Sequence, residues 1–362
     1  MMKVILISLA CFSFSLFAQE GKPMHDHSKM EKIHSKHHSM IHTSAPIGVM
    51  GSMHHSGFMI SLKQGLMKMN GNIFDGKNIS NSEILEMPNP LGNMPANLSV
   101  IPQNMDMKMT MVDVMYAPSN NLTFMGMAIY ASRDMQLNSY SPMMSRDLVG
   151  QFSTSSSDLS DISFSTLFHI NQIKNSRWHG EISFKKSIGS DDSMAQVLTP
   201  MGKEMNMIMP YAMQPGDSSS SLILGLTNTR KLNEDTVWVN QIQRKIVVSK
   251  SDWSYGDQTE FNSWIQHPLS KQLSISSRLK FVDQDALSGG NALIMAPVQT
   301  ANPKNYGGKE AFIGLGMNIN LDAFLKGNNS IGIEILKPVN QNKNNLQMKT
   351  DYQVIIGYQK SF

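Results

Sequence analysis

The chain has 362 residues, among them 31 methionines, 11 histidines and one cysteine, and its formal net charge is +3. Charged residues make up only 16% of the sequence, so its charge gives no indication of nucleic-acid binding. After the N-terminal segment no apolar run reaches the roughly 18 residues that a membrane-spanning helix needs, which excludes a helical membrane bundle.

Residues 1–18 have the pattern of an export signal. Lys3 provides a positive start, an apolar run covers residues 4–17, and Ala18 is a small residue at the expected cleavage point. The only cysteine, Cys11, lies inside this segment, and a lipobox ending at Cys11 would cut within the apolar run. Without cysteine, the exported chain would have neither disulfides nor thiol chemistry.

Residues 19–55 form a leader with eight of the eleven histidines. It has no aromatic residue and no β-branched run, so we expect it to be disordered or loosely folded and to lie in the periplasm. Imidazole suits Cu(II) and thioether suits Cu(I), and the spacing is not that of a closed zinc site. The leader is thus predicted to collect metal, in contrast to a merely solvated tail, with these histidines as ligands: His25, His27, His37, His38, His54 and His55.

From residue 56 onward, apolar and polar residues alternate in segments long enough for tilted strands to cross a bilayer. This alternation predicts an all-β domain over residues 56–362. The twelve predicted strands are 56–69, 103–116, 121–135, 157–170, 176–188, 218–231, 236–249, 258–267, 271–284, 308–320, 329–338 and 348–362.

The connections between these segments alternate in length. Those after even-numbered segments are short, whereas four of those after odd-numbered segments are long: 70–102, 136–156, 189–217 and 285–307. The remaining two, 250–257 and 339–347, are intermediate. Outer-membrane barrels have short periplasmic turns and long outer loops, while a soluble β-sandwich predicts no such alternation.

The C-terminal segment alternates and stops at Phe362, with Tyr352, Val354, Ile356 and Tyr358 on the same face. This pattern resembles the assembly signal of Gram-negative outer-membrane proteins. We therefore predict a transmembrane outer-membrane β-barrel of about 12 antiparallel strands. Its expected partners are outer-membrane lipid and, through Phe362, the assembly machinery.

Methionines follow one face of the second segment, where side chains two residues apart share a face. Asp113 lies on that face and would be costly in lipid, so the methionines should line the lumen. The same reasoning puts Ser61 and Lys63 of the first segment, and Thr123 and Arg133 of the third, on the lumen side. A further cluster, Met205, Met207, Met209 and Met213, is expected to fold over or into the pore.

Several thioethers within reach of one another suit Cu(I) or Ag(I), as a bound or transported ion. The alternative is that methionine, being adaptable and apolar, simply fills the barrel. The candidate lumen ligands are Met59, Met67, Met69, Met105, Met107, Met109, Met111, Met115, Met125 and Met127.

The sequence also resembles a known group of proteins, with a likeness that spans roughly residues 46–362. The stretches that carry it are 46–55, 57–61, 67–69, 115–119, 122–125 and 209–214. They are similar to outer-membrane transporter-like proteins related to the MetA-pathway of phenol degradation family. The resemblance implies a barrel that acts as a transporter, with copper-resistance functions among its methionine-rich members. It implies no particular binding or catalytic residues.

The first functional hypothesis is therefore an outer-membrane channel that handles copper or silver and works with periplasmic metal-handling proteins. The alternative is a channel for small organic, aromatic or hydrophobic solutes, with methionine as lumen packing. An enzyme is not expected, because a Ser–His pair would have to come from His169, His179 or His267, which form no recognisable catalytic pattern.

Overall fold

The computed structural model describes residues 45–49, 51, 53, 56–92, 94–322, 325 and 327–362. The unit that contains them, residues 41–362, is an antiparallel β-barrel. None of the described helices is long and apolar enough to span a bilayer. The predicted signal segment and residues 19–44 of the leader lie outside the described part of the chain.

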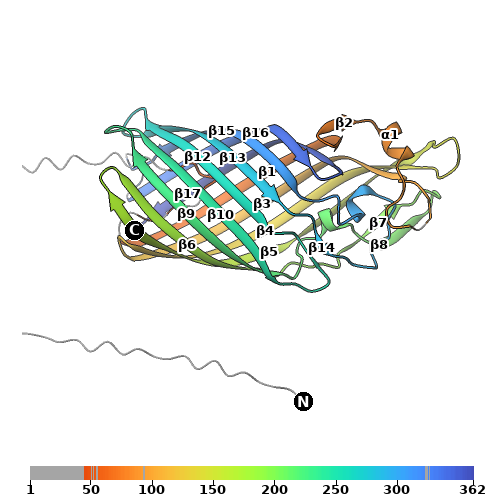
Figure 1. Ribbon diagram of the computed structural model, residues 1–362, viewed down its shortest axis with the longest axis horizontal. Coiled ribbons are helices and arrows are strands. Elements are labelled where there is room, and N and C mark those ends of the chain that lie inside the picture. The colour runs from red at the N-terminus through yellow and green to blue at the C-terminus, as the bar shows by residue number, and fades with distance from the viewer. Residues whose placement is uncertain are drawn as a thin grey trace, which may run out of the picture. The chain divides into compact units, whose positions relative to one another are not determined.

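Twelve strands form the barrel, and its last strand pairs with its first to close it (Figure 1). The predicted all-β class and strand number are thus confirmed. The barrel strands are β1 (Gly57–Phe74), β3 (Val100–Ser119), β4 (Leu122–Tyr140), β5 (Leu148–Ile173), β6 (Ser176–Ser187), β9 (Ser220–Lys231), β10 (Val237–Ser249), β12 (Gln258–Pro268), β13 (Leu273–Gln284), β15 (Gly308–Asn320), β16 (Asn328–Lys343) and β17 (Leu346–Ser361).

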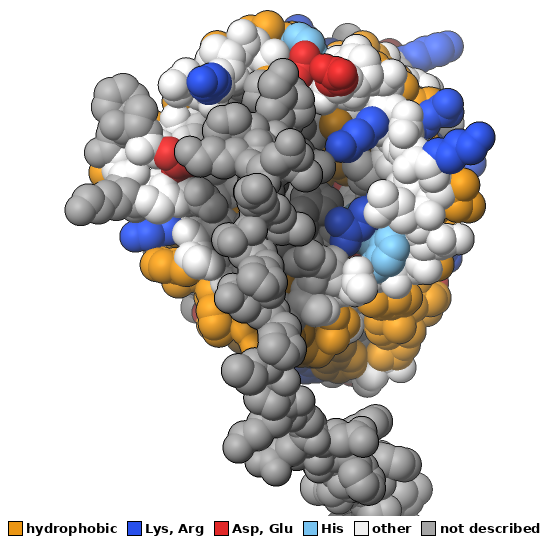
Figure 2. Space-filling model, turned by 90° about the vertical axis from the view of Figure 1, so that its left-hand side faces the viewer, with side chains coloured by type: hydrophobic (Ala, Val, Ile, Leu, Met, Phe, Trp, Pro, Cys, Tyr) orange, Lys and Arg blue, Asp and Glu red, His pale blue; other side chains and the backbone are white. Residues whose placement is uncertain are grey.

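Alternation along each strand gives the barrel an apolar outside and a polar inside. In β13, Ile275 and Phe281 are more than 40% exposed, whereas Ser276 and Arg278 between them are buried. In β1, Phe58 and Leu62 are about half exposed and Ser61 is buried. Figure 2 looks at one end of the barrel and shows orange apolar side chains along its rim, mostly at the bottom, and basic side chains around the end.

The short turns and the C-terminus lie at one end of the barrel, on the left in Figure 1. The smaller elements come from the connections at the other end, which we call the long-loop end. They are β2 (Lys77–Ile79), α1 (Asn81–Glu86), β7 (Met194–Leu198), β8 (Glu204–Ile208), η1 (Tyr211–Met213), β11 (Trp253–Ser254), β14 (Ser288–Gly289) and η2 (Gln299–Ala301).

Two of the predicted connections, one long and one intermediate, are shorter than expected. The predicted loop 136–156 shrinks to residues 141–147, because β4 and β5 remain paired as far as Tyr140 and Leu148. The predicted connection 339–347 is a tight turn between Lys343 and Leu346, in which Asn345 has a left-handed φ of 52°. Both strand pairs continue with polar residues, so the apolar alternation that marks the bilayer ends before the strands do.

Candidate functional site

The inner wall of the barrel has two chemically different sides. The inward side chains of β1, β3 and β4 are rich in methionine, whereas those of β5, β6 and β10 are mostly serine, glutamine and charged residues. The predicted inward face of β3 is confirmed by Asp113, which is 1% exposed and pairs with Lys63 of β1 at 3.2 Å. The lumen therefore combines apolar and charged surface.

At the short-turn end, methionines of three adjacent strands lie side by side. Met115 of β3 is opposite Met59 of β1 on one side and opposite Met125 of β4 on the other. Met53 packs against this row, and Met115 and Met125 are almost fully buried. Met53 thus belongs to a packed cluster, although the leader that contains it is expected from its composition to be disordered or loosely folded.

A second methionine row lies toward the long-loop end, where Met69, Met105 and Met135 are opposite one another. It belongs to an apolar cluster with Trp253 and with Met209 and Met213, which are almost fully buried. The expectation that the Met205–Met213 stretch folds over the pore thus holds for its last part, while Met205 is about half exposed. Between the two rows, Met109 and Met111 line the lumen beside Gly65.

Residues 45–49, which we call the lumen segment, lie inside the barrel against its wall. Ile47 is 3% exposed and occupies a recess at Gly332 and Gly357, where an added Cβ would come within 2.9 Å of Ile47. The Gly48 N–H donates to the Glu334 carboxylate at 3.1 Å, and Asn318 donates to the Ala45 carbonyl oxygen at 3.2 Å. The hydrogen bonds that hold this part of the predicted leader are made by its backbone. Such bonds cannot be inferred from the composition of its side chains.

The anchor of the lumen segment is a buried ion pair. Arg278 and Glu334 are 2% and 0% exposed, and Arg278 Nε lies 2.9 Å from Glu334 Oε1. Arg278 also donates to the Gly48 carbonyl oxygen at 3.5 Å. The pair therefore fixes two strands of the wall and the lumen segment to one another.

Loops cover the other end of the lumen and meet at three tyrosines, which we call the tyrosine cap: Tyr211, Tyr255 and Tyr306. The Tyr306 hydroxyl donates to the Thr300 carbonyl oxygen at 2.6 Å and accepts from the Ala212 N–H at 2.9 Å. Tyr255 donates to the Tyr211 carbonyl oxygen at 3.1 Å. Burial raises the pKa of all three phenols, so the cap is neutral at physiological pH.

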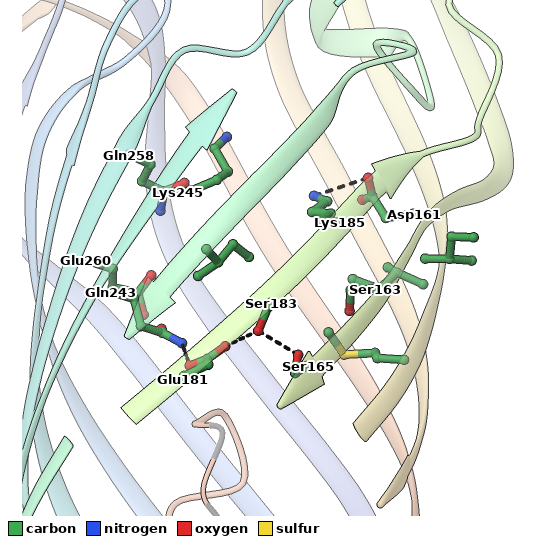
Figure 3. A pocket seen from close by; sticks show the side chains of 14 residues that line it. Asp161, Ser163, Ser165, Glu181, Ser183, Lys185, Gln243, Lys245, Gln258 and Glu260 are labelled. Atoms are coloured by element: carbon green, nitrogen blue, oxygen red, sulfur yellow. Dashed lines mark hydrogen bonds and ion pairs between the residues drawn. The ribbon is translucent and has the colours of Figure 1, made fainter. Parts of the chain in front are cut away.

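Two adjoining cavities of about 240 and 210 Å³ lie inside the barrel and share Asp161, Lys185, Lys245 and Gln258 in their walls. The first, shown in Figure 3, combines Met127 and Ile129 of β4 and Ile223 of β9 with polar side chains of β5, β6, β10 and β12. A hydrogen-bonded series runs across the polar part of the wall from Gln243 to Glu181, Ser183 and Ser165.

The second cavity reaches Tyr255 of the cap and contains the Arg133 side chain in its wall. Two ion pairs lie along the polar wall, Lys185 with Asp161 at 3.1 Å and Lys280 with Glu260 at 3.0 Å. Together the two cavities form a small chamber with an apolar and a polar part of its wall. The ring of Tyr255 bounds it toward the long-loop end.

The predicted metal ligands fall into two groups, of which the structure describes only the methionines. The six candidate histidines lie outside the described residues, and the methionines line the lumen as expected, but in two separate rows joined by partly exposed residues. No group of three or more His, Asp or Glu side chains suited to a metal occurs among the described residues. Metal binding by these methionines stays a prediction. Sequence reasoning missed the cavities, because their walls depend on which strands face each other across the lumen.

No protein-family model matches the chain, and no curated protein matches it. Its fold is similar to that of an outer membrane channel from Pseudomonas putida F1, with a TM-score of 0.54 over 87% of this chain and 100% of that one, at 9% identity. A deletion mutant of the monoaromatic hydrocarbon channel TodX aligns over 86% and 91% of the two chains at 11% identity, with a TM-score of only 0.43. At such identities the likeness shows the outer-membrane barrel fold alone, and the resemblance to the MetA-pathway family stays a prediction.

Proposed function

We propose that this chain is an outer-membrane channel for small organic solutes. The observation that carries the proposal is the pair of adjoining cavities in the lumen, with methionine and isoleucine on one side and polar groups on the other. Each is smaller than the roughly 300–1,000 Å³ of a typical drug-binding site, so the solute is small. A purely apolar solute would leave the polar wall desolvated, and a sugar would gain nothing from the methionines.

The lumen segment and the tyrosine cap limit passage from either end. Solutes would enter by displacement of the cap, cross the chamber and leave past the lumen segment. Opening would be a local movement of the cap or of the lumen segment, because single elements can move while the rest of a protein stays folded. Channel function and an outer-membrane location are also supported by the apolar outer face of the barrel.

Swelling of proteoliposomes tests this function. We expect faster swelling in isotonic nicotinamide, a small neutral aromatic amide, than in arabinose, after subtraction of the rates for protein-free liposomes. Arabinose entering as fast as nicotinamide would contradict an organic-solute channel. Rates equal to those of protein-free liposomes for both solutes would contradict channel function altogether.

A second candidate is the binding of a soft monovalent cation at the short-turn methionine row. The observation in its favour is that Met53, Met59, Met115 and Met125 pack in one cluster without any cysteine. Replacing Met115 and Met125 by Leu should lower the stoichiometry of Ag(I) binding to the full chain by one ion. Replacing the exposed Met143 and Met144 is the matched control. Unchanged stoichiometry in the first variant would show that this row is packing only.

A further inference from the structure

Arg133 is the most unusual charged residue in the lumen. It is 7% exposed and lies in the wall of the cavity below the tyrosine cap. Its Nε and Nη1 have no hydrogen-bond partner among the residues that the structure describes, and no carboxylate of that part of the chain pairs with it. A buried guanidinium without a partner is costly, so its position calls for an explanation.

The other buried lumen arginine, Arg278, differs from Arg133 in having a carboxylate beside it. Arg278 is similarly buried, but it faces Glu334 at 2.9 Å and the Gly48 carbonyl oxygen. Both arginines point inward from strands of the same barrel. Where Arg278 has a carboxylate beside it, Arg133 has the second cavity.

Lys245 is a second cation of the same cavity wall without a carboxylate partner among the described residues. It lies in the walls of both cavities and, within the described chain, has no carboxylate within ion-pair distance. Lys185 on the same wall is matched by Asp161. Figure 3 shows this contrast, with Lys185 joined to Asp161 and Lys245 unjoined beside Gln258.

The carboxylates of the second cavity are already engaged. Asp161 pairs with Lys185 and accepts from the Ser160 hydroxyl at 3.0 Å. Asp217 accepts from the Ser219 N–H and hydroxyl with one oxygen and from the Tyr255 N–H with the other. With three cations and two carboxylates in its wall, this cavity has one positive charge in excess.

We propose that Arg133 and Lys245 bind the carboxylate of a small organic monoanion within the lumen. The single excess charge matches one carboxylate, which a guanidinium binds well through charge-assisted hydrogen bonds. The apolar body of the anion would lie against Tyr255 or extend toward Met127, Ile129 and Ile223 in the adjoining cavity. This inference rests on the proposed organic-solute channel and specifies its substrate class.

Binding measured in micelles tests the site without depending on transport, so a failure here is distinct from a failure of the swelling assay. Titration of the full chain with sodium benzoate should show saturable binding, at least tenfold tighter than that of benzyl alcohol, its neutral counterpart. Arg133→Gln and Lys245→Gln should each weaken benzoate binding at least tenfold, and Arg133→Lys should restore part of it. Arg244→Gln is the control, because Arg244 adjoins Lys245 in β10 and is exposed on the opposite face.

Three results would overturn the proposal. The first is equal affinity for benzoate and benzyl alcohol, and the second is unchanged benzoate binding in Arg133→Gln. The third is inorganic phosphate binding as tightly as benzoate, which would show an anion site that does not recognise the organic body. Circular dichroism and the heat-dependent shift of the barrel in electrophoresis establish that each variant is folded.

Discussion

Arg278 and Arg133 both point into the lumen but have different surroundings. Arg278 contacts a carboxylate and the backbone of the lumen segment, whereas Arg133 faces a cavity. Burial alone is nearly the same for both, at 2% and 7% exposure. Their effects on stability should therefore be opposite. Arg278 stabilises the barrel, whereas the unpaired Arg133 lowers its stability and is available to bind an anion.

This contrast predicts opposite effects of the same substitution. Arg278→Met leaves Glu334 buried without its partner and should lower the free energy of unfolding by about 3–5 kcal/mol. Arg133→Met removes an unpaired buried cation and should leave stability unchanged or raise it. Urea denaturation of the refolded barrel in micelles, followed by tryptophan fluorescence, measures both.

The exposed pair Lys68–Asp106 provides the control, since Asp106→Asn should cost no more than about 1 kcal/mol. A loss of several kcal/mol in Arg133→Met would mean that Arg133 has a structural role. It would then contradict the assignment of this side chain to a ligand.

At the residue scale, sequence reasoning placed side chains correctly but could not find their partners. Spacing along β4 puts Arg133 on the lumen side, and Asp113 is inward as its position in the methionine face predicts. Whether a carboxylate faces Arg133 depends on strands that are distant in sequence and on the loops above them. That information lies in the closure of the barrel, not in any local pattern.

At the scale of elements, the lumen segment shows where composition is a poor guide. The leader has few residues suited to a core, yet Ile47 fits a recess made by two glycines of the wall and Gly48 binds Glu334 through its backbone. Short segments of this kind are positioned by a few specific contacts. They can be displaced without unfolding the barrel.

Displacement of the lumen segment should be visible in single-channel recordings. Ile47→Asp puts a carboxylate into an apolar recess near Glu334, so we expect the segment to leave the wall and the conductance to increase severalfold. Ile47→Val keeps the shape of the recess filled and should conduct like the unmodified protein. Equal conductance of Ile47→Asp and Ile47→Val would mean that this segment does not limit passage.

The tyrosine cap predicts both a mutant effect and a pH effect. Tyr306→Phe removes a donated and an accepted hydrogen bond, worth about 1 kcal/mol each, so the open population at pH 8 should rise about 5- to 30-fold. Burial raises the pKa of Tyr306 well above its ordinary value. A released or unfolded phenol ionises near pH ~10, whereas the closed cap keeps its proton.

The sign of the pH effect follows from this difference. The contribution of Tyr306 to closure is complete below about pH 10 and decreases as the pH rises from there toward the raised pKa. Channel openings should therefore become more frequent between pH 10 and 11 in the unmodified protein. In Tyr306→Phe the increase should be smaller, with the remainder due to Tyr211 and Tyr255. An identical pH dependence in both proteins would contradict this role for Tyr306.

At the scale of the whole molecule, the sequence was most informative about topology. Period-two alternation identifies all twelve strands, because lipid on one side and a polar lumen on the other impose opposite demands on successive residues. Strand ends were harder to predict. β5 begins at Leu148 instead of residue 157, because its first residues lie in a part of the sheet with no strong apolar alternation. The shape of the lumen is a property of the closed barrel and could not be predicted from single strands.

In the closed barrel, the backbone and the ring of Phe362 have different surroundings. The Phe362 backbone pairs with Phe58, at 2.8 Å from the Phe362 N–H to the Phe58 carbonyl oxygen, whereas its ring is 65% exposed. Phe362→Ala keeps the backbone bonds that close the seam, so stability in micelles should change by less than about 1 kcal/mol. If the exposed ring is what the assembly machinery binds, the fraction of the variant that reaches the outer membrane should fall severalfold.

Phe362→Tyr is the matched control for that measurement, because it keeps an aromatic ring at the same place. Membrane fractionation followed by the heat-dependent electrophoretic shift gives the assembled fraction, and urea denaturation of refolded protein gives the stability. Normal assembly of Phe362→Ala would show that the terminal ring is not recognised. A large loss of stability in that variant would instead assign the ring to the barrel seam, because a side chain that only serves recognition cannot alter the unfolding of a protein already folded.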